Sequence, residues 1–281
     1  MKKIIALLLV VCTVVCFAAC SKKTDDPENT KETVEVKKPD ATKAPEATEE
    51  TKAPEATEAP NTTDGTEGTE ATKPAETKVM THAEYAAAEL DTDVVVETYV
   101  QAAQGWWEKD GKGVITVYCQ SPDGAYFAYE MSCTKEDAEK LVPGTKIRIT
   151  GVKGEWAGEV EIIDCTFEFV AGDTFIAEAF DATALLGTED LIKHQNEKVT
   201  FKGLTFEKLE YQNGEPGKDI YVTFKLADKE YSFCVESYLT APDSDLYKAV
   251  GELKTGDVVD VEGFLYWYEG ANPHITNITK K

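Results

Sequence analysis

The distribution of apolar and polar residues divides the chain into three stretches. Residues 4–19 are apolar or small without interruption, residues 21–78 have Val34 and Val36 as their only large apolar residues, and residues 79–281 contain short runs in which apolar and polar residues alternate. Alternation over five to ten residues is typical of strands with one buried face. The third stretch is therefore expected to fold as a β-rich unit, and the second to lack a core.

The third stretch predicts the same order of elements twice. In the first copy we expect strands at 94–101, 114–120, 126–132, 145–152 and 159–169, with helices at 81–90 and 134–141. In the second we expect strands at 199–209, 220–226, 230–237, 258–265 and 274–279, with helices at 180–186, 189–195 and 243–250. Three strands, a helix and two strands is the order of the OB-fold. The predicted fold class is all-β with short helices, as two tandem five-stranded OB-fold (Greek-key) barrels after a disordered linker.

A diverged internal repeat supports this interpretation, because the segments 143–151 and 255–263 share a turn followed by a strand. The matched pairs are Gly144 and Gly256, Ile147 and Val259, Ile149 and Val261, and Gly151 and Gly263. The segments 83–90, 93–101 and 143–151 resemble OB-fold domains of secreted bacterial proteins, including those that accompany extracellular nucleases. The resemblance implies the fold, and no nuclease activity is carried over, since the nuclease domain of such proteins is not found in this sequence.

The N-terminal stretch has the features of an export signal. Lys2 and Lys3 precede the apolar run, which is too short to span a bilayer comfortably. It ends in Phe17-Ala-Ala-Cys20, which resembles the lipobox of bacterial lipoproteins. The resemblance implies removal of residues 1–19, lipidation of Cys20 and a place on the outer face of the bacterial cell membrane. Cleavage without lipidation, or an uncleaved anchor, are the other interpretations.

Residues 20–78 are predicted to form a disordered linker rich in Thr, Lys, Glu, Pro and Ala. An octamer occurs at 42–49 and again at 51–58. Such a segment has too little apolar surface to offset its ordering entropy. As a flexible chain it would span roughly 40 Å. The predicted domains that follow are 79–171 and 172–281.

The charge balance bears on the expected partners. The whole chain has 29 basic and 52 acidic residues, and the predicted domains hold 18 of the former and 37 of the latter, a net charge of −19. Nucleic-acid binding depends largely on Lys and Arg contacts to phosphate. Nucleic acid is therefore expected to be a poor partner, and the lipid bilayer, a surface glycan or an envelope protein are the expected ones.

No motif predicts catalysis or a cofactor. The sequence contains no GxSxG, HExxH, Walker A or Rossmann pattern, and its three histidines are far apart. We therefore expect neither an enzyme nor a metal site. Cys119, Cys133, Cys165 and Cys234 lack metal-site spacing. Cys133 and Cys165 could form a disulfide, although buried free thiols are the expected state.

Aromatic residues carry the candidate binding chemistry. OB-folds typically bind ligands on the face of strands two and three, between the one–two and four–five loops. The aromatic residues expected at these places are Trp106, Trp107, Tyr118, Tyr126, Tyr129, Trp156, Tyr211, Tyr221, Tyr231, Trp267 and Tyr268. They favour a non-catalytic, surface-tethered protein that binds a neutral or cationic envelope ligand. The alternatives are that the rings pack the joint between the barrels in a structural subunit of an envelope complex, or that the chain is an accessory enzyme.

Overall fold

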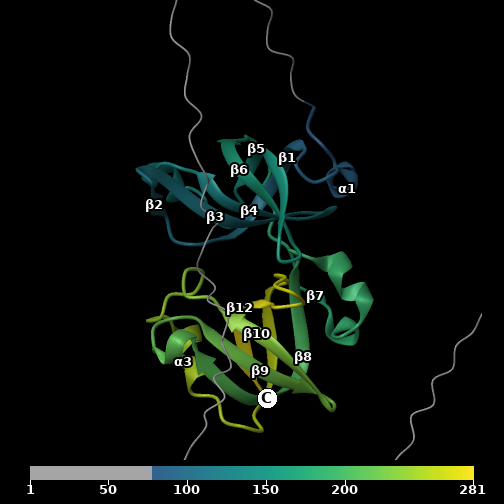
Figure 1. Ribbon diagram of the computed structural model, residues 1–281, viewed down its shortest axis with the longest axis vertical. Coiled ribbons are helices and arrows are strands. Elements are labelled where there is room, and N and C mark those ends of the chain that lie inside the picture. Colours follow the sequence, from purple (N-terminus) through teal and green to yellow (C-terminus); the bar gives the residue numbers. More distant parts are fainter. Residues whose placement is uncertain (1–77) are drawn as a thin grey trace, which may run out of the picture. The chain divides into compact units, whose positions relative to one another are not determined.

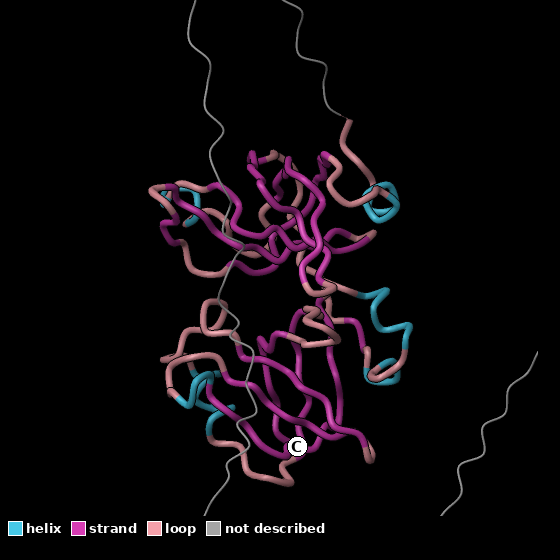
Figure 2. Tube along the Cα trace, in the orientation of Figure 1, coloured by secondary structure: helices cyan, strands magenta, loops and turns pink. Residues whose placement is uncertain are grey.

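The computed structural model describes residues 78–281. The predicted signal, Cys20 and all but the last residue of the predicted linker lie outside the described residues. Within the described part, no helix combines the length and the apolarity needed to cross a bilayer. Two six-stranded sheets account for about half of this part of the chain, and its helices are short (Figures 1 and 2).

The first sheet closes into a barrel with OB-fold connectivity. Its strands run in the order β1-β5-β6-β4-β3-β2, with an additional β1–β3 pairing that closes the ring. The pairing of β4 with β6 is parallel and the others are antiparallel, so the fold class expected from the sequence is confirmed. The strands are β1 (Asp93–Ala103), β2 (Trp107–Lys109), β3 (Lys112–Ser121), β4 (Gly124–Ser132), β5 (Lys146–Trp156) and β6 (Glu159–Phe169), and the helices are α1 (His82–Ala87) and α2 (Lys135–Ala138).

The second sheet repeats the arrangement. Its order is β11-β12-β10-β9-β8-β7, and an additional β11–β8 pairing closes the ring. The strands are β7 (Phe180–Asp181), β8 (Lys198–Tyr211), β9 (Ile220–Leu226), β10 (Lys229–Val235), β11 (Val258–Phe264) and β12 (His274–Lys280). The helices are the 3-10 helices η1 (Thr183–Leu185), η2 (Glu189–His194) and η3 (Gln212–Gly214), and the α-helix α3 (Asp245–Gly251).

Each ring encloses its own hydrophobic core, because alternate residues of every strand point inward. The first core contains Val117, Ile149 and Ile162, and the second contains Phe201, Phe224 and Phe233, all with at most 1% of their surface exposed. Capping side chains fix the helix starts that the sequence predicted. Thr81 and Glu84 form the capping box of α1, and Thr134 caps α2.

The repeated glycines Gly151 and Gly263 occupy the same structural place in the two barrels. Each lies beside a register shift in the pairing of the fourth barrel strand with the fifth. A Cβ atom on Gly151 would lie 2.6 Å from the Cβ of Cys165, and one on Gly263 would lie 2.1 Å from the carbonyl oxygen of His274. The two strands can approach so closely only because both positions lack a side chain.

Two segments differ from the expected elements. Residues Trp107–Lys109, expected to be loop, pair with β3 as the short strand β2, because the turn that follows them folds the chain back as a hairpin. The segment 180–186, expected to be helical, begins with β7, which pairs in parallel with β8, and only then forms η1. The backbone pairing available at the edge of the second barrel overrides the weak helical pattern.

The two repeated glycines give a test of the barrel geometry. Gly151→Ala and Gly263→Ala should each lower the free energy of unfolding by about 2–3 kcal/mol, because neither site has room for a methyl group. Gly105→Ala is the matched control, since a Cβ atom there would meet nothing within 4 Å. Urea unfolding of the purified protein, followed by circular dichroism, measures all three. A loss below about 0.5 kcal/mol for both repeat variants would contradict the packing described.

Candidate functional site

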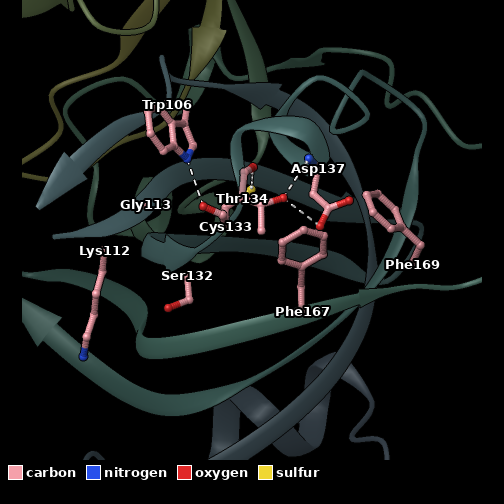
Figure 3. A pocket seen from close by; sticks show the side chains of 9 residues that line it. All are labelled: Trp106, Lys112, Gly113, Ser132, Cys133, Thr134, Asp137, Phe167 and Phe169. Carbon is pink, nitrogen blue, oxygen red and sulfur yellow. Dashed lines mark hydrogen bonds between the residues drawn. The ribbon is translucent and has the colours of Figure 1, made fainter.

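A groove with aromatic walls opens on the first barrel (Figure 3). Its volume is about 490 Å³, within the range of small-ligand sites. Trp106 stands on one side of the opening and Phe167 and Phe169 on the other, with Thr134 and Asp137 between them. We call this hollow the aromatic groove. It is lined by Trp106, Lys112, Gly113, Ser132, Cys133, Thr134, Asp137, Phe167 and Phe169.

Trp106 is fixed in place by the strand beneath it. Its indole Nε1 donates a hydrogen bond to the backbone oxygen of Cys133, at 2.9 Å. A Cβ atom on Gly113 would lie 2.7 Å from the indole ring, so the ring can rest on β3 only because residue 113 is a glycine. The wall is therefore formed before any ligand arrives, which reduces the entropy cost of binding.

The rim of the aromatic groove is polar. The Thr134 hydroxyl accepts from the backbone amide of Asp137 at 3.1 Å and donates to its carboxylate at 3.0 Å. Lys140 also donates to that carboxylate, at 2.7 Å, and this bond is the main cause that lowers the pKa of Asp137. Phe169 is 41% exposed and lies under the Lys140 ammonium, 5.6 Å from its ring centroid. The groove thus combines aromatic rings with hydroxyl and charged groups.

The usual ligand face of the first barrel is covered. Tyr118 of β3 and Phe127 of β4 point outward from that barrel, but they form a hydrophobic cluster with Phe264 of the second barrel, and each is at most 3% exposed. The Tyr118 ring stacks on Phe264 at 4.6 Å between centroids. The Tyr118 hydroxyl and Nδ1 of His274 form a hydrogen bond of 2.6 Å, and burial lowers the pKa of His274 to about 3, so its ring is neutral. We call this contact region the joint.

The loops between the fourth and fifth barrel strands complete the joint. The amide of Glu269, in the second barrel, donates to the carbonyl of Ala157, in the first, at 2.7 Å. Trp156 is 46% exposed, and its ring lies 5.2 Å from that of Tyr268. A Cβ atom on Gly158 would lie 2.8 Å from the Trp267 ring, so a glycine is needed there.

Two buried carboxyl groups, one from each barrel, accept hydrogen bonds from the other barrel. Oε2 of Glu159, in the first barrel, accepts from the amide of Trp267 at 2.7 Å and from the side chain of Gln195 at 3.1 Å. Oε2 of Glu236, in the second barrel, accepts from the side chain of Gln104 at 3.0 Å. Neither carboxyl forms an ion pair within residues 78–281. Burial, as the largest cause, raises the pKa of each to about 8, against the hydrogen bonds that each accepts.

The structure brings some of the predicted site residues together and separates others. Tyr118, Trp156, Trp267 and Tyr268 meet at the joint, with Tyr129 beside them, 39% exposed. Trp106 lines the aromatic groove, while the neighbouring Trp107 is exposed on β2. Tyr126 belongs to the first core, Tyr211 and Tyr231 pack against the second, and Tyr221 is half-buried on β9.

Tyr118 and Tyr126 are the two predicted binding residues that cannot present a ring to solvent in this structure. Tyr118 points out of its barrel, as alternation along the strand predicts, yet the second barrel covers it. Tyr126 pairs with Cys119 across β3 and β4 and therefore points inward, against Tyr85 at 5.0 Å. Placing Tyr126 on the ligand face was an error of strand register.

The sequence interpretation missed the second wall of the groove. Phe167 and Phe169 alternate with polar residues at the end of the fifth barrel strand, which was a usable signal. Nothing in the sequence distinguishes Glu159 or Glu236 from the many exposed acidic residues. Among the described residues, no group of three or more His, Cys, Asp or Glu side chains has a metal-binding arrangement. The four described cysteines are buried free thiols.

Known proteins resemble this chain in fold only. No protein-family model matches the chain, and no curated protein matches it. A solved structure of a murine DNA-binding protein bound to double-stranded DNA matches with 12% identity and a TM-score of 0.35, over 66% of this chain and 96% of that one. The Ifi202 HINa domain in complex with a 20-bp double-stranded DNA matches with 13% identity and a TM-score of 0.31, over 68% and 97%.

A replication protein A heterotrimer bound to single-stranded DNA also matches, with 11% identity and a TM-score of 0.31, over 67% of this chain and 49% of that one. These matches correct the prediction that nucleic acid is a poor partner, because proteins with barrels of this kind are described in complex with DNA. The exclusion drawn from acidic composition is withdrawn. At such low identity and TM-score the likeness concerns the fold alone, and no DNA ligand follows from it.

The buried carboxyls of the joint predict an unusual pH dependence. Their pKa values are higher in the folded state than in the unfolded chain, so their contribution to stability is complete below about pH 4.5 and is lost as the pH rises through 8. Between pH 6 and pH 9 the free energy of unfolding should fall, by at most roughly 3 kcal/mol for each carboxyl. Urea unfolding at the two pH values measures this loss.

Glutamine variants distinguish the contribution of the two joint carboxyls to the pH dependence from that of the other acidic groups. Glu159→Gln and Glu236→Gln keep the shape of the side chain and cannot ionise, so each should make the pH dependence shallower. Glu168→Gln is the control, because Glu168 is 61% exposed at its side chain and pairs with Arg148. Equal slopes in wild type and in both joint variants would contradict the assignment.

Proposed function

We propose that this chain is a non-catalytic binding protein that takes a neutral or cationic glycan of the bacterial envelope in the aromatic groove. The observation that carries the proposal is the pairing of two aromatic walls, Trp106 and Phe169, with a rim that holds hydroxyl and charged side chains. A sugar ring has an apolar face of C–H groups that stacks on aromatic rings, and its hydroxyl groups need donors and acceptors around the edge. The groove offers both.

The position of the groove also supports the proposal. The face of β3 and β4, where OB-folds usually bind, is occupied by the second barrel. The groove lies at the loop between β1 and β3, the start of α2 and the end of β6, and no other part of the described chain fills it. Binding there requires no separation of the barrels.

Tethering completes the proposed role. The lipobox-like sequence at Phe17–Cys20 and the polar stretch that follows it support a lipoprotein whose barrels are held off the outer face of the membrane. Two or more acyl chains on Cys20 would anchor the chain stably, where one chain would not.

A structural or assembly subunit of an envelope complex is the second candidate. The observation that favours it is the presence of two exposed apolar side chains near Gly144. Val142 is 54% exposed, and Ile176, which a Cβ atom on Gly144 would contact at 3.4 Å, is 62% exposed. Side chains of this kind fit a protein partner. This candidate predicts an envelope protein that crosslinks to the segment around Ile176.

Binding to a panel of envelope glycans, with single-stranded DNA as a further probe, tests the groove. Trp106→Ala and Phe169→Ala should each weaken binding of the glycan found by at least tenfold, since each removes one wall. Trp107→Ala is the matched control, because Trp107 is the adjacent tryptophan, 43% exposed, and does not line the groove. Fluorescence titration measures affinity, and circular dichroism checks the fold.

The proposal fails if no glycan in the panel binds, or if Trp107→Ala weakens binding as much as the two wall variants. Binding of DNA alone, lost in the wall variants, would assign the groove to nucleic acid instead.

Lipidation is tested separately from the ligand. Cys20→Ser should move the protein from the detergent phase to the aqueous phase in Triton X-114 partitioning, because it removes the residue that carries the acyl chains. Cys16→Ser is the control, since Cys16 lies within the predicted signal. Retention of the Cys20→Ser variant in the detergent phase, with no labelled fatty acid incorporated, would favour an uncleaved anchor.

A further inference from the structure

Glu161 is a largely buried residue whose carboxyl group has no partner among the described residues. Only 8% of its surface is exposed, and it forms no hydrogen bond or ion pair within the described residues. A buried charge is normally paired, because removing it from water is costly. Glu159, two residues earlier, accepts two hydrogen bonds in a comparable position. Glu161 has no such contact, and its carboxyl oxygens are not among the fully enclosed unpaired atoms of the described residues, so a ligand can reach them.

The outer face of the first barrel places Glu161 among aromatic rings. Ile162 points into the core and pairs with Ala128 of β4, so Glu161 and Tyr129 point outward from neighbouring strands. On its other side, Glu161 pairs with Gly154 of β5, which has no side chain to cover or contact the carboxyl. Trp156, next along the same face of β5, is 46% exposed.

The second barrel contributes two more rings. The ring centroid of Tyr268 lies 5.2 Å from that of Trp156, and the ring centroid of Tyr266 lies 5.4 Å from that of Phe127. After burial, which is the largest cause, the charge of Glu161 is among the causes that raise the pKa of both Tyr129 and Tyr266. Because Ala128 and Ile162 pair in parallel, Glu161 lies beside Phe127, which Tyr266 contacts, so Glu161 is close to rings from both barrels.

We propose that Glu161 and the rings of Tyr129, Trp156, Tyr266 and Tyr268 form a second binding site, for a primary ammonium group carried by a ligand. Aromatic faces attract cations, and a carboxylate in their midst supplies the counter-charge. A primary ammonium group has three N–H donors. It could therefore supply the hydrogen bonds that no protein group donates to Glu161. A quaternary ammonium would leave the carboxylate without a hydrogen bond.

The electrostatic surroundings support a cationic ligand. The charged side chain that affects Glu161 most is Glu130, an acid that itself pairs with Lys109. Burial, and then the charge of Glu130, raises the pKa of Glu161 to about 7. The free site is therefore half-ionised near neutral pH, and an arriving ammonium group would favour the ionised form. The net charge of −23 attracts cations to the whole chain.

Three small probes test the proposal on the full chain at pH 8 and constant ionic strength. Propylammonium should bind saturably, with a change in tryptophan fluorescence. Propanol has the same shape without the charge and should give no change, and tetramethylammonium has the charge without N–H groups and should bind at least tenfold more weakly. Lowering the pH to 6 should weaken propylammonium binding severalfold, because Glu161 becomes protonated.

Variants assign the response to this site. Glu161→Gln should weaken propylammonium binding at least tenfold, and it should remain folded because it removes an unpaired buried charge. Glu155→Gln, an exposed acid on the same hairpin, should leave binding unchanged. Trp106→Ala should also leave it unchanged, so failure here is distinguishable from failure of the groove. The inference is overturned if propanol or tetramethylammonium binds as well as propylammonium, or if Glu161→Gln binds normally.

Discussion

The burial of Tyr118 and Phe127 against Phe264 is the contact on which the joint between the two barrels depends. An open face of β3 and β4 would be a ligand surface in most OB-folds, and here it becomes the centre of the joint. Around this apolar centre, Glu159 and Glu236 each accept a hydrogen bond from the other barrel. Because neither has a cation beside it, the joint is strongest when both are protonated.

Because the second barrel covers the face of β3 and β4, the candidate ligand surfaces lie on other parts of the described structure. The aromatic groove lies on the first barrel alone, with Trp106 held by the Cys133 carbonyl. The proposed ammonium site lies at the edge of the joint, where Glu161 has no partner and rings from both barrels approach it. One surface suits the C–H faces and hydroxyls of a sugar, and the other suits a positive group.

Local pattern was enough to predict most of the fold. The predicted bounds of β6 and β9 match those observed, and two of the glycines that revealed the repeat, Gly151 and Gly263, lie where close strand contacts require a glycine. The candidate site was harder to predict, because a side chain buried between the barrels is covered by a segment that is distant in the sequence. Alternation correctly turned Tyr118 outward, but it carried no information on what covers that face. The unpaired state of Glu161 likewise depends on Gly154, which is its neighbour only across the sheet.

Amide hydrogen exchange, resolved by residue with NMR, tests the joint most directly. The amides of Gly105, Trp267 and Glu269 lie in loops, and each donates to an acceptor on the opposite barrel: Tyr238, Glu159 and Ala157, respectively. If the joint exists in solution, all three should exchange slowly at pH 6, at rates comparable to those of strand amides. Exchange at the rate of unprotected loop amides would show that the barrels are not joined. The face of β3 and β4 would then be open to a ligand.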